Sequence, residues 1–230
     1  ATSLAKQAAA FRREHHIPEV YSQGLTPSLL STPQEARKLD SASLAALAQG
    51  ALAQLSVLEP DVAASAALFQ GPPRDRELLT NEENSVLNQE LRRLLMLISP
   101  HLQARSAQEI VEVLLQRYHV HKYNVDDVLA CALPHHDSPL FTRLLQGLHV
   151  KGNPTWSWLQ TLKQKPATLV RATLAKYCAK DISVLAFIGE AVMESARLHK
   201  GNRPMATFFS AVWLDTLASA KSVGPDIVGA

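Results

Sequence analysis

The 230-residue sequence predicts an all-α fold, an α-solenoid of stacked antiparallel helix pairs with about ten helices. Apolar residues recur at helical spacing almost everywhere, whereas the alternation that indicates strands is scarce. The 13 prolines fall mostly near the edges of the periodic segments, as expected for short helices joined by tight connections. A single globular helical bundle is the alternative fold.

The first predicted helices are defined by a start signal and by an apolar stripe. Thr32 and Glu35 have the spacing of a capping box, with Pro33 at the first helical position. The next helix carries one stripe that consists of Leu44, Leu47, Ala51, Leu55 and Leu58. After it, residues 71–83, GPPRDRELLTNEE, are predicted to form an exposed and flexible connection.

Two strongly periodic helices and one short helix follow this connection. The stripes of the two long helices are Leu87, Leu91, Leu94, Leu95 and Ile98, and then Ile110, Val113, Leu114 and Tyr118. Ser106 and Glu109 predict a capping box at the start of the second. Asn124 is predicted to cap the short helix, with Asp126 and Asp127 in its first turn. Stacked in order, these helices would form HEAT-like pairs, whose sequence repeats are only weakly self-similar.

Composition excludes several classes of function. The 23 basic and 21 acidic residues give a net charge of +2, so the chain as a whole is not a polyanion binder. Cys131 and Cys178 lie in apolar helical patterns, which predicts buried thiols in a reducing compartment. The stretch ISVLAFIGEAVM is too short to span a membrane, and the first residues lack the apolar core of a signal peptide. We therefore expect a soluble intracellular protein with no membrane partner.

The charge is unevenly distributed, because residues 138–180 contain seven basic residues and no acidic ones. Apart from Arg143, the basic residues of this segment are Lys151, Lys163, Lys165, Arg171, Lys176 and Lys180. This block is a candidate contact surface for RNA or for an acidic partner. A solvated rim of a helical array explains the same pattern, since helix geometry scatters sparse charges over different faces.

Residues 117–143, RYHVHKYNVDDVLACALPHHDSPLFTR, gather four histidines, a cysteine and three aspartates. The ligand types suit zinc, but their spacing matches no common zinc motif and the chain has no Cys-x-x-Cys, so we expect no metal. A nucleophile elbow and a glycine-rich phosphate loop are also missing, which argues against an enzyme, a cofactor and a small-molecule substrate. A partner-binding surface at successive interhelical turns remains. There His119 and His121 alternate with Tyr118 and Val120, so one pair can pack while the other faces out.

The segment QRYHVHKYNVDDVLACALPHHDSPLFTRLLQGL resembles the N-terminal region of a known family, the large HEAT-repeat subunit of the small-subunit processome. Its members are called U3 small nucleolar RNA-associated protein 10 in fungi and HEAT repeat-containing protein 1 in animals. The positions that carry the resemblance are Tyr118, Val120, His121, Tyr123, Asn124, Cys131, Leu133, Pro134, His136, Phe141 and Arg143. The segments TSLAKQ, SPHL and YCAKD and the pair Trp156 and Trp158 add weaker support.

The resemblance implies that residues 1–230 are a single HEAT-like N-terminal domain of a longer, non-catalytic, nucleolar protein. Such a domain would dock onto other subunits of the UTP-A (t-UTP) subcomplex, one of them a WD-repeat β-propeller, early in pre-18S rRNA maturation. Direct contact of residues 138–180 with pre-rRNA or snoRNA is the alternative. The candidate protein contacts are His119, His121, Tyr123, Asn124, His136, Arg143, Trp156 and Trp158. Tyr123 and the tryptophans could equally be core residues, and Cys131 and Phe141 are assigned to packing.

Overall fold

The computed structural model describes residues 28–30, 39–164, 171–198 and 203–221. All regular structure in these ranges is helical, with ten α-helices, three 3-10 helices and no strand, which confirms the predicted fold class. In order the helices are α3 (Ser41–Leu55), η2 (Pro60–Phe69), α4 (Asn81–Ile98), η3 (Ser99–His101), α5 (Arg105–Tyr118), α6 (Val120–Tyr123), α7 (Val125–Ala132), η4 (Leu133–His135), α8 (Pro139–Gly147), α9 (Leu159–Gln164), α10 (Arg171–Lys180), α11 (Ile182–Leu198) and α12 (Arg203–Lys221).

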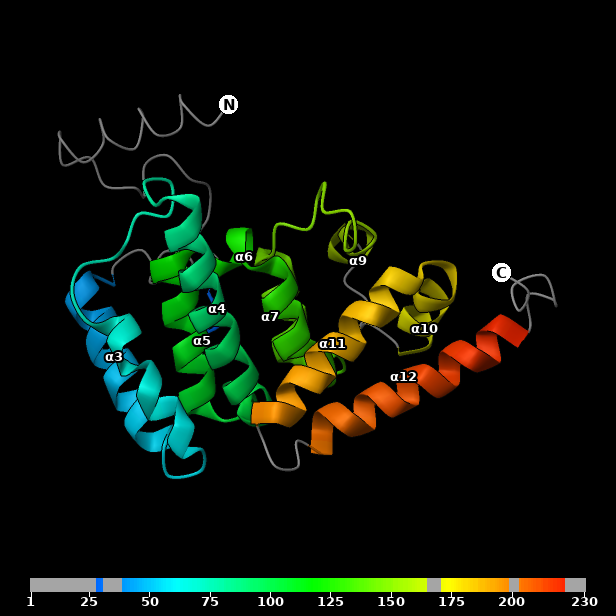
Figure 1. Ribbon diagram of the computed structural model, residues 1–230, viewed down its shortest axis with the longest axis horizontal. Helices are drawn as coiled ribbons and strands as arrows, with labels where there is room; N and C mark the ends of the chain where they lie inside the picture. Colours follow the sequence, from blue (N-terminus) through cyan, green and yellow to red (C-terminus); the bar gives the residue numbers. More distant parts are fainter. Residues whose placement is uncertain (1–27, 31–38, 165–170, 199–202, 222–230) are drawn as a thin grey trace.

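The helices pack side by side along the long axis of the molecule (Figure 1). At one end, α3 packs against α5 and α4 packs against α7. At the other end, α12 packs against both α10 and α11. Helix α11 also contacts α4 and so joins the two ends. This stacking of helix against helix, each contacting near neighbours in the array, is the packing of an α-solenoid.

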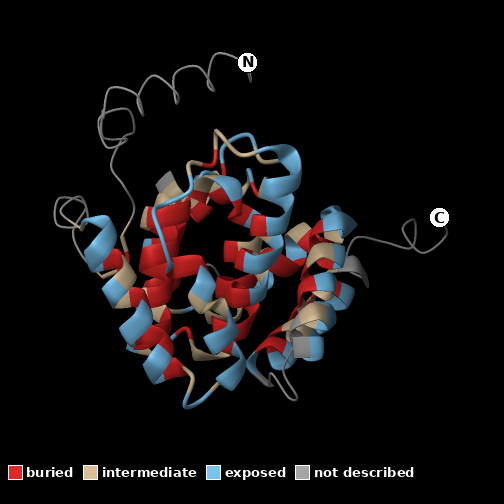
Figure 2. Ribbon diagram, turned by 60° about the vertical axis from the view of Figure 1, so that its left-hand side comes forward, coloured by how far each residue is buried: buried red, intermediate tan, exposed pale blue. Residues whose placement is uncertain are grey.

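A continuous apolar core follows from the predicted stripes. The stripes of α4 and α5 are buried over their whole length, and that of α3 is buried or half-buried as far as Leu55. Leu58, the last residue of the predicted first stripe, lies beyond the end of α3 and is exposed, so its assignment was wrong. Figure 2 shows the buried residues on the inward sides of the helices and the exposed ones on their outward sides.

Local start signals fix helix α4 but not helix α5. Thr80 caps α4: its hydroxyl accepts from the Glu83 amide at 3.2 Å, and the Glu83 carboxylate accepts from the Thr80 amide at 2.8 Å. The connection therefore ends at residue 80, and the rest of the predicted 71–83 segment is helix. The box predicted at Ser106 is wrong, since Ala104 is the cap residue of α5. The box predicted at Thr32 lies outside the described residues.

The entry into α5 is fixed from the preceding turn instead of by a capping hydroxyl. The side-chain amide of Gln108 donates to the carbonyls of Leu102 and Gln103, at 3.3 and 3.2 Å. These bonds tie the first turn of α5 back onto the loop that leads into it. Ser106 consequently lies inside the first turn and is buried, where its hydroxyl cannot act as a cap.

Candidate docking surface

The predicted motif is centred on a sharp turn between α5 and α7. Helix α5 ends at Tyr118, and His119 then takes a left-handed conformation with φ of 50°, which costs a non-glycine residue about 1 kcal/mol. The turn is held from below, because Val120 is fully buried and the Tyr118 hydroxyl donates to the carbonyl of Leu68. The short helix α6 lies at the upper edge of the array in Figure 1, and its last residue, Tyr123, is 41% exposed.

His121 is placed opposite to the prediction, because its side chain is only 3% exposed. Its ring lies edge-on between those of His119 and His149, with centroids 5.8 and 5.3 Å away. Desolvation by burial, reinforced by the neighbouring histidines, lowers the pKa of His121 to about 3. The ring is therefore neutral at physiological pH and packs under the turn, so it cannot offer a partner an outward-facing cation.

Asn124 is also buried, and its side chain does not cap α7. Its amide nitrogen donates to the side-chain oxygens of Asn88 and Asp127, at 3.1 and 3.0 Å. Its oxygen accepts from Arg76 at 3.1 Å. Arg76 in turn donates to the side chain of Asn84 at 2.9 Å and to that of Asn88. We call this group of Arg76, Asn84, Asn88 and Asn124 the Arg76 cluster.

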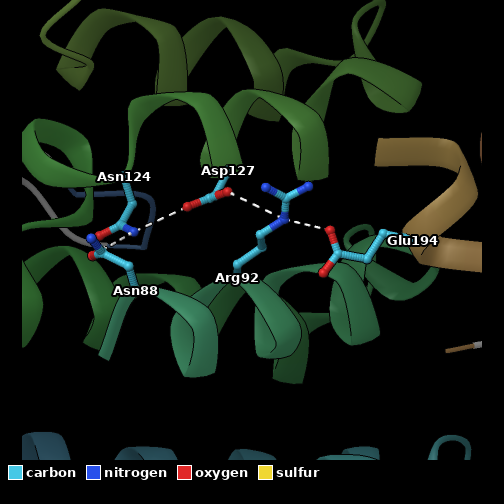
Figure 3. Close-up of polar contacts among 5 residues, drawn as sticks. All are labelled: Asn88, Arg92, Asn124, Asp127 and Glu194. Atoms are coloured by element: carbon cyan, nitrogen blue, oxygen red, sulfur yellow. Dashed lines mark hydrogen bonds and ion pairs between the residues drawn. The ribbon is translucent and has the colours of Figure 1, made fainter. Parts of the chain in front are cut away.

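Asp127, which accepts from Asn124, also belongs to a second polar cluster (Figure 3). Arg92 of α4 lies 3.8 Å from the Asp127 carboxylate and is hydrogen-bonded to Glu194 of α11. Burial raises the pKa of Asp127, although the Asn124 amide and Arg92 act in the opposite direction. This group, Arg92, Asp127 and Glu194, is called the Arg92 cluster below. It connects α4 and α7 to α11 by polar contacts.

Tyr123 and His119 are the predicted residues that the structure brings together at an accessible surface. The Arg76 guanidinium lies 4.9 Å from the centroid of the Tyr123 ring, a distance suited to a cation–π contact. His119 and Tyr123 line a small cavity together with residues of the 71–80 connection. Because Arg76 is fixed by three asparagines, the tyrosine ring rests on a rigid support.

The remaining predicted contact residues lie elsewhere. His136 is half-buried, with its ring 5.3 Å from that of Phe208 in α12, and burial lowers its pKa. Arg143 is exposed on α8. Trp156 is fully buried and donates to Asp126 at 2.7 Å, and Trp158 stacks on Tyr177 at 4.1 Å. Trp156 thus packs in the interior, whereas Trp158 is half-buried against Tyr177.

The basic block is partly used inside the molecule. Lys163 donates to the carbonyl of Leu148 at 2.7 Å, and Arg171 donates to Asp215 of α12 at 2.7 Å. Lys180 lies 5.9 Å from the centroid of the Tyr177 ring. Lys151 and Lys176 are exposed, while Lys165 lies outside the described residues. Contacts within the chain therefore occupy several of the cations that the sequence offered to RNA.

The two cysteines are buried, as predicted. Desolvation raises the pKa of Cys131 to about 12 and that of Cys178 to about 11, so neither thiol is a ready nucleophile. In the part of the chain that the structure describes, no three His, Cys, Asp or Glu side chains gather as a metal site would require. No helix in those ranges combines the length and the apolar character needed to cross a membrane.

Sequence reasoning missed two charged residues that point inward from α5. Glu112 is fully buried and accepts from the backbone amide of Leu29 at 2.7 Å. Arg117 is 3% exposed and lies beside the 71–80 connection. A signal for Arg117 exists in the sequence, because it falls on the apolar stripe seven residues after Ile110. A charged residue at such a position has to find partners inside the fold.

Comparisons with known proteins find relatives along nearly the whole chain, although no family model matches it. The chain is 29% identical to HEAT repeat-containing protein 1 of Homo sapiens, over 99% of this chain and 11% of that protein. It is 27% identical to U3 small nucleolar RNA-associated protein 10 of Schizosaccharomyces pombe, over 98% of this chain and 14% of that protein. An uncharacterized Arabidopsis thaliana protein is 32% identical over 88% of this chain and 9% of its own length. The chain thus spans about a tenth of the curated relatives it matches.

Proposed function

Because this chain belongs to the family of HEAT repeat-containing protein 1 and U3 small nucleolar RNA-associated protein 10, we propose that it is a non-catalytic docking domain in ribosome biogenesis. It attaches the protein that contains it to other subunits of the UTP-A (t-UTP) subcomplex of the small-subunit processome. The partner is a protein subunit, of the WD-repeat β-propeller kind, and the site of action is the nucleolus. There the assembly serves the early maturation of pre-18S rRNA.

The observation that carries the proposal is the α6 turn with Tyr123 at its tip. Tyrosine is among the residue types that most often dominate protein–protein binding energy, and rigid support lowers the entropy lost on binding. Tyr123 has such support from Arg76, whose guanidinium lies under its ring. A helical array that leaves this turn exposed at its edge suits a scaffold, because each helix contacts its neighbours and the edge stays free for partners.

The test is a pull-down of the chain with reconstituted UTP-A subunits. Tyr123→Ala is expected to weaken retention about thirtyfold, the effect of a hot-spot residue worth about 2 kcal/mol. Trp213→Ala is the matched control, because Trp213 is an aromatic residue of α12 with the same exposure of 41%. Unchanged retention of the Tyr123 variant, or equal losses for both variants, would contradict docking through the α6 turn.

The same pull-down separates protein docking from RNA binding. Retention through protein contacts should survive nuclease treatment and a rise in salt from about 0.05 to 0.2 M, whereas binding through phosphates would fall steeply. Loss of retention under nuclease would overturn the proposal. It would direct attention to the exposed Lys151 and Lys176 of the basic block.

A further inference from the structure

A small polar cavity of about 100 Å³ lies between the 71–80 connection and the end of α5. Three arginines line it, Arg74 and Arg76 from the connection and Arg117 from α5, and Asp75 is the one carboxylate among its lining residues. Tyr123 forms part of the wall. A space of this size has room for several water molecules or one small oxyanion. The lining is therefore positively charged at a site that accepts a single group.

Arg117 is incompletely bonded within the described part of the molecule. Its Nη2 donates to the carbonyls of Gln70 and Gly71, at 3.0 and 2.8 Å, and to that of Pro72 at 3.3 Å. Its Nε and Nη1 are buried and have no hydrogen-bond partner there. Buried donors without an acceptor are costly, and more so when the group is charged. Two nitrogens of one guanidinium thus lack an acceptor within the described residues.

The charges of Arg76 and Arg117 are also uncompensated. Among the described residues, neither guanidinium has a carboxylate within ion-pair distance, unlike Arg92, Arg105 and Arg171. The side-chain acceptors of Arg76 are all neutral amides of asparagine. A buried cation without a counterion is unfavourable, and a guanidinium is suited to bind a carboxylate through two parallel hydrogen bonds. An anion in the cavity would supply what both residues lack.

The surroundings of the cavity favour an acidic side chain over RNA. Residues 71–83 contain four acidic residues against two arginines, and Glu82 and Glu83 at the start of α4 are exposed. Hydrogen bonds from Thr80 lower the pKa of Glu83, and the nearby charge of Arg74 adds to this effect. These carboxylates in the surrounding segment would repel an extended polyanion more than a single acidic side chain, which brings only one negative charge.

We propose that this cavity, here called the arginine pocket, receives the carboxylate of an aspartate or glutamate side chain from the docked protein partner. The carboxylate accepts hydrogen bonds from Arg117 inside the pocket while its own chain passes over Tyr123. That the carboxylate belongs to a protein rests on the proposed docking function. The arginine pocket then gives the docking surface its charge specificity, and Tyr123 gives it apolar contact.

The experiment is an NMR titration of the chain that follows the Nε–H signal of Arg117, identified by its loss in Arg117→Gln. The probes are a synthetic serine-rich peptide with one central glutamate, the same peptide with glutamine for glutamate, and a single-stranded uridine oligonucleotide. The glutamate peptide should shift the Arg117 signal saturably, and the other two should leave it unmoved. No shift with the glutamate peptide, or a shift with the oligonucleotide alone, would overturn the proposal.

Variants make the test independent of folding. Arg117→Gln should weaken peptide binding about tenfold, but it also removes the bonds to three carbonyls, so its fold is checked by circular dichroism. Arg74→Gln, at an exposed lining residue, should weaken binding about threefold with the fold unchanged. Arg93→Gln makes the same charge change at an exposed position of α4 outside the pocket and should have no effect. Equal losses for Arg74→Gln and Arg93→Gln would indicate general electrostatics and reject the pocket.

The peptide titration needs no processome subunit, whereas the pull-down needs no acidic peptide. A failed titration with intact, Tyr123-dependent retention would reject the arginine pocket and leave the docking function standing. A shifted Arg117 signal together with failed retention would reject the proposed docking partner. The arginine pocket would then remain a carboxylate-binding site for a different protein.

Discussion

Two arginines, Arg76 and Arg92, approach the start of α7 from neighbouring positions and have opposite kinds of partners. Arg76 is buried and donates only to neutral asparagine side chains, whereas Arg92 is half-exposed and pairs with two carboxylates. Asn124 and Asp127 are hydrogen-bonded to each other and connect the two clusters. The two arginines therefore differ in charge balance. Carboxylates within the protein neutralise Arg92, whereas Arg76, among the described residues, keeps an unpaired positive charge near the surface.

The difference indicates which cluster is structural and which can serve a partner. The Arg92 cluster fixes α11 against α4, and its charge is already balanced by Asp127 and Glu194. The Arg76 cluster supports Tyr123 and forms one wall of the arginine pocket. A binding surface needs a group that still lacks an interaction partner. The Arg76 cluster meets this condition, because its guanidinium has no carboxylate partner among the described residues.

The largest expected effect is on the Arg76 side. Arg76→Ala should lower the free energy of unfolding by about 3 kcal/mol, because one buried and two half-buried asparagine oxygens lose their common donor. Urea denaturation followed by circular dichroism measures this loss. Arg74→Ala, which removes a neighbouring exposed arginine, is the control and should cost less than about 0.5 kcal/mol. A loss below about 1 kcal/mol for Arg76→Ala would mean that the asparagines find other partners.

Acidification should change the contributions of His121 and Asp127 to stability in opposite directions. Burial lowers the pKa of His121 to about 3. Between pH 6.5 and 3, His121 is therefore protonated in the unfolded chain but neutral in the folded chain. This histidine therefore removes stability as the pH falls, by about 2 kcal/mol at pH 5. Asp127 has a raised pKa, so its contribution to stability increases as the pH falls toward its ordinary value.

The pH effect is measured as the free energy of unfolding at pH 7 and at pH 5 for the natural chain and for His121→Leu. The variant should lose about 2 kcal/mol less between the two values than the natural chain does. Val120→Ala, at a buried neighbour in α6 that does not titrate, serves as the comparison variant and is expected to keep the natural pH dependence. A pH dependence that is the same with and without His121 would show that the ring is accessible to protons in the folded chain.

The helices could be predicted from the sequence more completely than the candidate site could. The stripe from Leu87 to Ile98 predicted α4 correctly, because helical periodicity is a local property that burial reads directly. The orientation of His121 could not be predicted from alternation, because Val120 and His121 are neighbours in a short helix and both are buried, so neither alternating pattern holds. The partners of Asn124 come from α4 and from the 71–80 connection, and one sequence does not indicate which distant segments meet.

The smallest expected effect is on the Arg92 side. Arg92→Ala should lower the free energy of unfolding by about 1 kcal/mol, because a half-exposed ion pair is screened by solvent and contributes little. Arg93→Ala, the next and exposed residue of α4, should cost less than about 0.5 kcal/mol in the same urea measurement. Combining Arg92→Ala with Glu194→Gln should cost less than the sum of the two, since either change alone already removes the ion pair between α4 and α11. If Arg92→Ala destabilises the chain as much as Arg76→Ala, the charge balance of a cluster does not decide its role, and the contrast between the two arginines fails.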